Sequence, residues 1–307
     1  MYRMFACIGC CVRLRSHLIA CIPGSFQPVA RNVIIVSAKS IRMKAIFLTC
    51  VLLFLGQAMA CTDFYMNFTD HRLSARTVDL GLTSNWTITA WPRAKRAVDI
   101  LANKIAGWSA PLATIGFTAN WFGDDVYGFP SLFGDALNEK GVSCSLQSLV
   151  GTQYEDRADD KLNIFAGLFC HFVASNYGDV MTLKKDLDNI RIWGPDVLAQ
   201  HFAVRDVQGN SLIIECMGGR KRVYLDTNDG VTGYGIMTNE PTFDWHLENI
   251  AHYTWKRTLS RQAIATPGNF YPEERFLRVH MIKAGMQSEG MFSNVSYQTA
   301  VSLTAQV

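Results

Sequence analysis

A tripeptide of the pattern small-x-small directly before Cys61 divides this chain into two parts of different character. The segment 45–55 is apolar, follows Lys44, and leads to Ala, Met and Ala at 58–60. A basic start, an apolar middle and a small-residue exit are the three parts of a secretory signal peptide. The sequence therefore predicts cleavage after Ala60, so that the folded domain begins at Cys61.

The first 60 residues hold the basic excess of the chain. They contain seven Lys or Arg and no Asp or Glu, so the formal charge of +3 for all 307 residues becomes −4 for residues 61–307. Met43 begins a signal of normal length, which predicts an upstream over-read or leader extension at 1–42, a signal peptide at 43–60 and one domain at 61–307. A genuine longer leader or membrane anchor is the alternative.

The composition of residues 61–307 excludes two classes of partner. Its tight basic clusters, at 93–96 and 220–222, are short and are typical of solvated faces, so no nucleic acid is expected. No apolar stretch in this part reaches the roughly 18–20 residues that span a bilayer, so no stable membrane span is expected after processing. We therefore expect a secreted or periplasmic protein.

A cysteine at a newly made N-terminus combines a nucleophile and a base in one residue. The sulfur can attack a carbonyl carbon, and the α-amine, with a reference pKa of about 7.7–8.0, can accept the thiol proton near neutral pH. Two other roles for Cys61 stay open, namely lipid attachment and a half-cystine. Lipid attachment usually has a branched aliphatic residue where this chain has Ala58.

The other cysteines of this domain are Cys144, Cys170 and Cys216, which stand far apart in largely apolar surroundings. Their number is odd if Cys61 stays free, so we expect buried free thiols rather than a disulfide framework. The domain has no Cys-x-x-Cys and no paired histidines with further ligands, so no metal site is expected.

The domain is predicted to have strands in hairpins and helices in groups. Strands are predicted at 61–68, 73–80, 85–91, 116–132 (with a long loop), 142–146, 202–216 (a hairpin that turns at 206–210), 222–225 and 234–238, and helices at 161–177, 181–189, 195–202, 245–258 and 274–286. This order favours stacked antiparallel sheets with helices packed outside over alternating βαβ units.

Five short motifs follow one another from Cys61 onward. They are Cys-Thr at 61–62, Ala-Arg-Thr-Val-Asp at 75–79, Ala-Leu-Asn-Glu-Lys-Gly at 136–141, Met-Thr-Asn-Glu-Pro-Thr-Phe-Asp-Trp-His at 237–246, and Pro-Gly-Asn-Phe-Tyr-Pro-Glu-Glu-Arg-Phe at 267–276. In this order they closely resemble the choloylglycine hydrolase family, which contains penicillin V acylases and conjugated bile salt hydrolases. The resemblance implies an α+β fold, the four-layer αββα sandwich of N-terminal nucleophile hydrolases, which cleaves linear amides without a metal or organic cofactor.

The resemblance also implies a role for each of five catalytic residues. Cys61 would attack the amide carbonyl, and Arg76 would lie against its sulfur, where a fixed cation favours the thiolate. Asp79 would accept a hydrogen bond from the α-amine and orient it. Asn239 would donate its side-chain amide to the developing oxyanion, and Arg275 would complete the charged cluster near the nucleophile.

Substrate binding is assigned to Trp86, Trp91, Trp121 and Gln147. Aromatic walls suit a flat group or a long acyl chain, although core packing is the alternative for each tryptophan. Gln147 stands within about a residue of the position where bile salt hydrolases carry an asparagine as a second oxyanion donor. This departure from the family pattern weakens the bile-salt interpretation.

We therefore expect an acylase that releases an acyl group from an amine, with a small-molecule amide as substrate. A secretory signal matches the Gram-negative branch of the family, which acts on penicillin V or N-acyl homoserine lactones. Conjugated bile acid hydrolysis is the first alternative. The second is an inactive truncated homologue, a binding or relic protein, because residues 292–296 resemble a point well before the usual end of the family. The third alternative is a lipid-anchored envelope protein. The family resemblance also suggests that the protein forms a homotetramer.

Overall fold

The computed structural model describes residues 17–19, 35–37, 61–67, 72–78, 86–99, 106–119, 132–227, 235–260 and 267–288. The chain divides into two compact units, one of Met1–Ala58 with Leu80–Thr83 and the other of Met59–Asp79 with Ser84–Val307. In the first unit, β1 (His17–Ile19) pairs antiparallel with β2 (Ile35–Ser37). The predicted boundaries at residues 42 and 60 lie outside the described residues. Within those residues, no helix is both long and apolar enough to cross a membrane.

The second unit contains residues 61–79 and 84–307 of the predicted domain. Its strands are β3 (Thr62–Asn67), β4 (Arg72–Thr77), β5 (Trp86–Trp91), β6 (Arg96–Asp99), β7 (Ala106–Ser109), β8 (Thr114–Ala119), β9 (Phe133–Asn138), β10 (Ser143–Ser148), β11 (Leu162–Phe165), β12 (Ile190–Trp193), β13 (Gln200–Arg205), β14 (Ser211–Met217), β15 (Arg220–Asp226) and β16 (Ile236–Thr238). Its helices are α2 (Phe169–Asn176), α3 (Val180–Asp186), α4 (Phe243–Ser260) and α5 (Pro272–Ser288), with 3-10 turns at Ala166–Leu168, Leu187–Asn189 and Asp196–Leu198.

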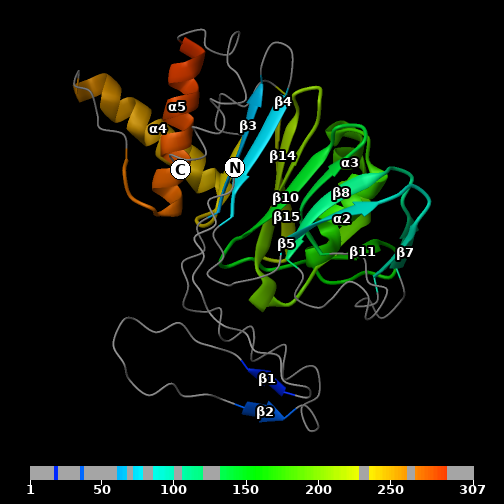
Figure 1. The fold of residues 1–307 in the computed structure, drawn as a ribbon. Helices are drawn as coiled ribbons and strands as arrows, with labels where there is room; N and C mark the ends of the chain where they lie inside the picture. The colour runs from blue at the N-terminus through cyan, green and yellow to red at the C-terminus, as the bar shows by residue number, and fades with distance from the viewer. Residues whose placement is uncertain are drawn as a thin grey trace. The chain divides into compact units, whose positions relative to one another are not determined.

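Two antiparallel sheets form the middle layers of this unit. One has seven strands in the order β15-β14-β13-β10-β9-β8-β5, and the other has three in the order β16-β3-β4. Helix α5 packs on β16 and β3 with α4 beside it, while α2 packs on β9 and β10 (Figure 1). The layers are therefore helix, sheet, sheet and helix, as the sequence predicted.

Strand alternation decides which side chains meet between the two sheets. Successive side chains of a strand point to opposite faces. In β3, Phe64 and Met66 join the apolar cluster of α4 and α5, whereas the side chain of Asp63 meets Arg205 and Ser145 of the seven-stranded sheet. Cys61 precedes Asp63 by two residues, so its side chain also faces the space between the sheets.

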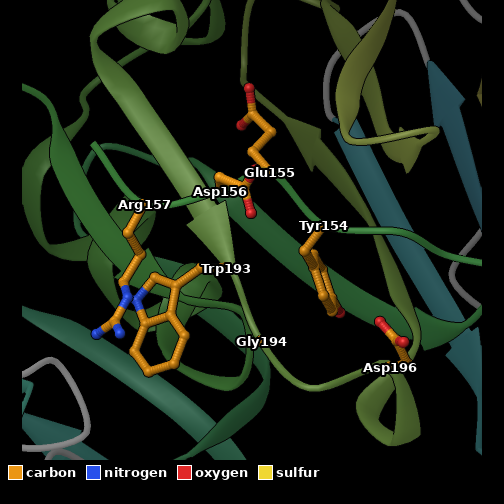
Figure 2. Close-up of a pocket in the computed structure, with 7 residues that line it drawn as sticks. All are labelled: Tyr154, Glu155, Asp156, Arg157, Trp193, Gly194 and Asp196. Atoms are coloured by element: carbon orange, nitrogen blue, oxygen red, sulfur yellow. The ribbon is translucent and has the colours of Figure 1, made fainter.

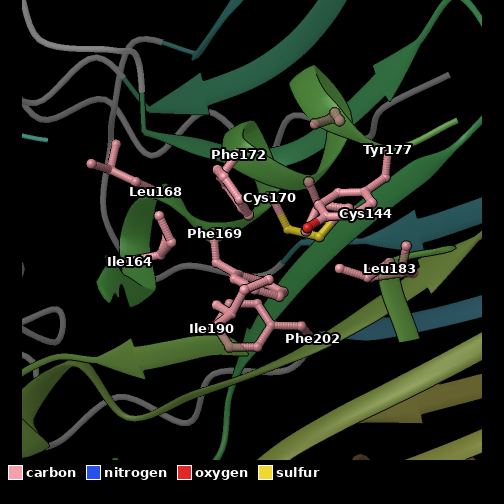
Figure 3. Packing of buried hydrophobic residues seen from close by; sticks show 14 of the residues in the cluster. Cys144, Ile164, Leu168, Phe169, Cys170, Phe172, Tyr177, Leu183, Ile190 and Phe202 are labelled. Atoms are coloured by element: carbon pink, nitrogen blue, oxygen red, sulfur yellow. A yellow bond between two sulfur atoms is a disulfide. The ribbon is translucent and has the colours of Figure 1, made fainter. Parts of the chain in front are cut away.

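The larger hydrophobic core lies between the seven-stranded sheet and α2. Phe202 of β13 packs on Phe169 of α2 with ring centroids 4.6 Å apart (Figure 3). In the same core, Cys144 of β10 and Cys170 of α2 form a disulfide with Cα atoms 5.1 Å apart. The expectation of free thiols at these two positions is therefore wrong, because packing of α2 on β10 brings together cysteines that are 26 residues apart. Among the described cysteines, Cys61 and Cys216 are free and buried.

Two predicted helices are also wrong. The first half of 161–177 is strand β11, which pairs in parallel with β12, and only its second half is helix α2. The predicted helix at 195–202 is a short 3-10 turn followed by β13. In both segments, burial against neighbouring strands outweighs the helical spacing of the apolar residues. The structure confirms the hairpin of β3 with β4, the hairpin of β13 with β14, and helices α4 and α5.

Candidate active site

Cys61 lies immediately before β3, with 1% of its surface exposed. Antiparallel pairing of β3 with β16 places Thr62 opposite Thr238, and so brings Asn239 beside Cys61. The backbone nitrogen of Cys61 donates a hydrogen bond to Oδ1 of Asn239 at 2.9 Å. In the full chain this nitrogen belongs to a peptide bond, and cleavage after Ala60 would turn it into an α-amine at the same place.

Arg76 reaches the sulfur of Cys61 from the neighbouring strand. In the β3–β4 register Arg76 lies opposite Asp63, so both side chains share the face that Cys61 uses. Nη2 of Arg76 lies 3.9 Å from Sγ of Cys61. Burial lowers the pKa of Arg76, but the nearby carboxylate of Asp135 and the sulfur of Cys61 together hold it above its usual value. Arg76 therefore supplies a fixed positive charge beside the sulfur.

Arg275 contacts the backbone around Cys61. It extends from the first turn of α5, is 1% exposed, and donates through Nη1 to the carbonyl oxygen of Cys61 and to Oγ1 of Thr62. Its Nη2 donates to Oδ1 of Asn239 at 3.0 Å, and its Nε donates to the carbonyl of Phe270 at 2.9 Å. This residue thus fixes the position of Cys61.

Asn239 connects three segments through one side chain. Its Oδ1 accepts hydrogen bonds from Cys61 and Arg275, and its Nδ2 donates to the carbonyl of Ser148 at 3.0 Å. A side-chain amide has two N–H donors. One of them binds Ser148, so the other remains as a candidate donor to a substrate oxyanion.

The remaining predicted site residues either lie outside the described residues or contact other parts of the chain. Asp79 and Trp121 lie outside the described residues, as does the side chain of Trp86, whose backbone belongs to β5. Trp91 is 5% exposed and packs edge-on against His171 at 4.7 Å, within the larger core. Gln147 is 1% exposed, and its Nε2 donates to the carbonyl of Met237 at 3.3 Å.

Sequence reasoning missed a group of charged side chains between the sheets. Asp63 forms a buried ion pair with Arg205 of β13 and accepts a hydrogen bond from Ser145 at 2.8 Å. Asp135 of β9 accepts a hydrogen bond from Nη1 of Arg76 at 2.9 Å. Burial raises the pKa of Asp135, while the guanidinium of Arg76 acts in the opposite direction. The one signal available in the sequence was the two-residue spacing between Cys61 and Asp63 in a predicted strand.

A separate surface pocket of about 260 Å³ lies among Tyr154, Glu155, Asp156, Arg157, Trp193, Gly194 and Asp196. The guanidinium of Arg157 lies over the ring of Trp193, 4.7 Å from its centroid (Figure 2). The pocket shares no residue with the group around Cys61. The described part of the chain contains no group of three side chains that could hold a metal ion.

Comparison with known proteins points to a family. The family model for linear amide C–N hydrolases of the choloylglycine hydrolase family matches residues 61–294. A bile salt hydrolase/transferase of Clostridium perfringens is 27% identical over 252 residues, which are 74% of this chain and 72% of that protein. A penicillin V acylase of Pectobacterium atrosepticum is 26% identical over 255 residues, which are 78% of this chain but only 64% of the acylase.

Solved structures show the same fold. A mutant conjugated bile acid hydrolase from Clostridium perfringens superimposes with a TM-score of 0.68 at 23% identity, covering 80% of this chain and 78% of that one. The penicillin V acylase from Agrobacterium tumefaciens gives a TM-score of 0.64 at 20% identity, covering 80% and 72%. Both likenesses confirm the expected α+β fold of N-terminal nucleophile hydrolases.

Proposed function

The chain belongs to the choloylglycine hydrolase family of linear amide C–N hydrolases, and from this premise we propose that it is a secreted acylase with Cys61 as its nucleophile. The observation that carries the proposal is that both the sulfur and the backbone nitrogen of Cys61 are contacted by polar side chains. Arg76 faces its sulfur at 3.9 Å, and Asn239 accepts a hydrogen bond from its nitrogen at 2.9 Å. A thiol and an amine held in this way can serve as nucleophile and base.

The proposed reaction has two steps. In the first, a bond forms between Sγ of Cys61 and the carbonyl carbon, and the thiol proton passes to the α-amine. The carbon–nitrogen bond then breaks, and the leaving amine departs with that proton. In the second, water adds to the thioester and gives a proton to the α-amine, which returns it to the sulfur as the carbon–sulfur bond breaks. The free N–H of Asn239 would stabilise the oxyanion in both steps.

The leader is part of the proposal, because the base exists only after Ala60 and Cys61 are separated. The family match begins at residue 61, which supports a domain at 61–307 behind a signal peptide at 43–60 and an upstream segment at 1–42. We therefore propose that the mature protein is periplasmic or secreted.

The proposed substrates are penicillin V and N-acyl homoserine lactones. Gln147 supports this choice over bile acids, because this chain has a glutamine within about a residue of the position where bile salt hydrolases carry an asparagine, and its buried side chain donates to the carbonyl of Met237 at 3.3 Å. Hydrolysis of conjugated bile acids remains the second candidate, since the bile salt hydrolase/transferase of Clostridium perfringens matches this chain over 72% of its own length. An inactive relic is the third.

The test is to express the full chain in a secreting bacterial host and to isolate its processed product. Intact mass gives the cleavage site, with a mass that begins at Cys61 as the expected result. The product is then incubated separately with penicillin V, a long-chain N-acyl homoserine lactone and glycocholate, and amine release is followed. Activity on either of the first two substrates is expected.

Two matched variants make this test decisive. Cys61→Ala should be processed and folded but inactive, and full activity in this variant would overturn the nucleophile assignment. Ala60→Phe places a bulky residue at the small-residue exit and should leave an uncleaved, inactive chain in which Cys61 is intact. Release from glycocholate alone would favour the bile-acid candidate, and a folded, correctly cleaved protein without any activity would favour the relic.

A further inference from the structure

Arg76 is held by the seven-stranded sheet and not by its own strand. Nη1 donates one hydrogen bond to the carbonyl of Gly134 and one to Oδ1 of Asp135, both at 2.9 Å. Gly134 and Asp135 are consecutive residues of β9. The two donors of Nη1 are therefore both used, and both are anchored to a strand of the other sheet.

These anchors also determine the position of the second terminal nitrogen. A guanidinium is a rigid plane, so fixing Nη1 by two hydrogen bonds fixes the direction in which Nη2 points. Nη2 faces Sγ of Cys61 at 3.9 Å. Without the anchors, the long side chain of Arg76 could adopt other rotamers in which its charge lies farther from the sulfur.

We propose that Asp135 is a positioning residue of the hydrolase, whose carboxylate holds the guanidinium of Arg76 so that the positive charge faces the Cys61 sulfur. This inference rests on the proposed role of Cys61 as the nucleophile. Asp135 acts through Arg76, which is the residue that touches the reacting atom.

The other two arginines near Cys61 are engaged by other partners and do not take the place of Arg76 at its sulfur. Arg205 is occupied by Asp63 in a buried ion pair and by Ser74, to which its Nη1 donates at 3.1 Å. Arg275 directs its guanidinium to the backbone of Cys61 and to Asn239. Among the described residues, Arg76 is therefore the cation in hydrogen-bonding contact with the sulfur, and Asp135 is the carboxylate paired with it.

Two substitutions of Asp135 distinguish its positioning of Arg76 from a direct effect of its negative charge on the Cys61 thiol. Asp135→Asn removes the negative charge but keeps an oxygen that can accept from Nη1. Asp135→Ala removes both the charge and the acceptor. If the carboxylate acts only by its charge, both changes favour the thiolate equally. If it positions Arg76, the alanine variant loses the cation from the sulfur and disfavours the thiolate, whereas the asparagine variant does not.

The measurement is the rate at which iodoacetamide alkylates Cys61 as a function of pH, read by mass spectrometry of the peptide that contains it. The full chain is expressed and its product used as isolated. Glu139→Gln is the matched control, because Glu139 follows the same strand and forms an ion pair with Arg93 away from Cys61. Thermal melting of every variant is recorded in parallel.

The expected result is an alkylation midpoint that rises by about one pH unit in Asp135→Ala. The midpoint should stay at or below the wild-type value in Asp135→Asn, and Glu139→Gln should match wild type. Equal falls in both Asp135 variants would overturn positioning in favour of a charge effect. A lower melting temperature with unchanged midpoints would show a purely structural role. Alkylation needs neither leader cleavage nor turnover, so these outcomes can be distinguished from a failure of the proposed function.

Discussion

The backbone nitrogen of Cys61 and the side chain of Asn239 are joined by a 2.9 Å hydrogen bond across 178 residues of sequence. The same amide of Asn239 also contacts Arg275 of α5 and Ser148 at the end of β10. One side chain therefore connects Cys61 to the small sheet, the outer helices and the larger sheet. The position of the Cys61 nitrogen depends on all three contacts.

Replacing Asn239 by Ala should lower kcat about 100- to 1000-fold, because both the proposed oxyanion donor and the acceptor for the Cys61 nitrogen are lost. Asn239→Asp keeps the acceptor and removes the donor, so it shows which of the two contacts matters more. Steady-state kinetics on the best amide substrate gives kcat, and thermal melting checks the fold. A kcat within threefold of wild type in the alanine variant would contradict the assigned role.

The parts of the site that the sequence could predict are local or carried by motifs. Cys61, Arg76, Asn239 and Arg275 stand in motifs that the family resemblance marks, and the structure brings all four together. The β3–β4 hairpin follows from a short polar segment between two predicted strands, which is a local signal.

The parts that the sequence could not predict depend on contacts between distant segments. Asp135 meets Arg76 because β9 and β4 lie in facing sheets, and no spacing between residues 59 positions apart indicates this. The disulfide of Cys144 with Cys170 likewise depends on how α2 packs on β10. In β11, pairing with β12 outweighs a helical spacing of apolar residues.

The Cys144–Cys170 disulfide should contribute about 2–4 kcal/mol to the free energy of unfolding, because it closes a loop between residues 26 apart and restricts the unfolded chain. Unfolding in urea with and without dithiothreitol measures this contribution. The double variant Cys144→Ala with Cys170→Ala should lose its response to dithiothreitol, whereas Cys216→Ala should keep it. An identical urea midpoint for wild type under both conditions would show that the disulfide contributes no stability.

His246 should make the protein less stable in mild acid. Burial lowers the pKa of His246 from 6.5 to about 3 in the folded state. Between these values the unfolded chain binds a proton that the folded chain does not, so the stabilisation is complete above pH 6.5 and is lost as the pH falls toward 3. From pH 7 to pH 5, His246 should account for a loss of about 2 kcal/mol.

The matched variant for this prediction is His246→Phe. It keeps the stacking on Phe276, where the ring centroids are 4.3 Å apart, but it cannot take up a proton. Other groups that titrate in acid, including His280, whose pKa burial also lowers, are present in both proteins and cancel in the comparison. Urea unfolding at pH 7 and pH 5 should therefore show a smaller loss in the variant. Equal losses would refute the prediction.

The buried ion pair of Asp63 and Arg205 should behave as a single unit. These residues are 1% and 2% exposed, and Asp63 lies two positions after Cys61. Removing one partner leaves the other as an uncompensated buried charge, so Asp63→Leu and Arg205→Met should each cost about 3–5 kcal/mol. The double variant replaces both charges by apolar groups and should cost much less than the sum of the two.

Urea unfolding of the wild type, the two single variants and the double variant forms the required cycle. We expect strongly non-additive losses in the free energy of unfolding. The double variant should be no less stable than the less stable of the two single variants. Additive losses would mean that each residue stabilises the fold through separate contacts, such as those with Ser145 and Ser74. Because β3 carries both Asp63 and Thr62, whose hydroxyl contacts Arg275, the single variants should also lower amide hydrolysis, and the double variant should recover part of it.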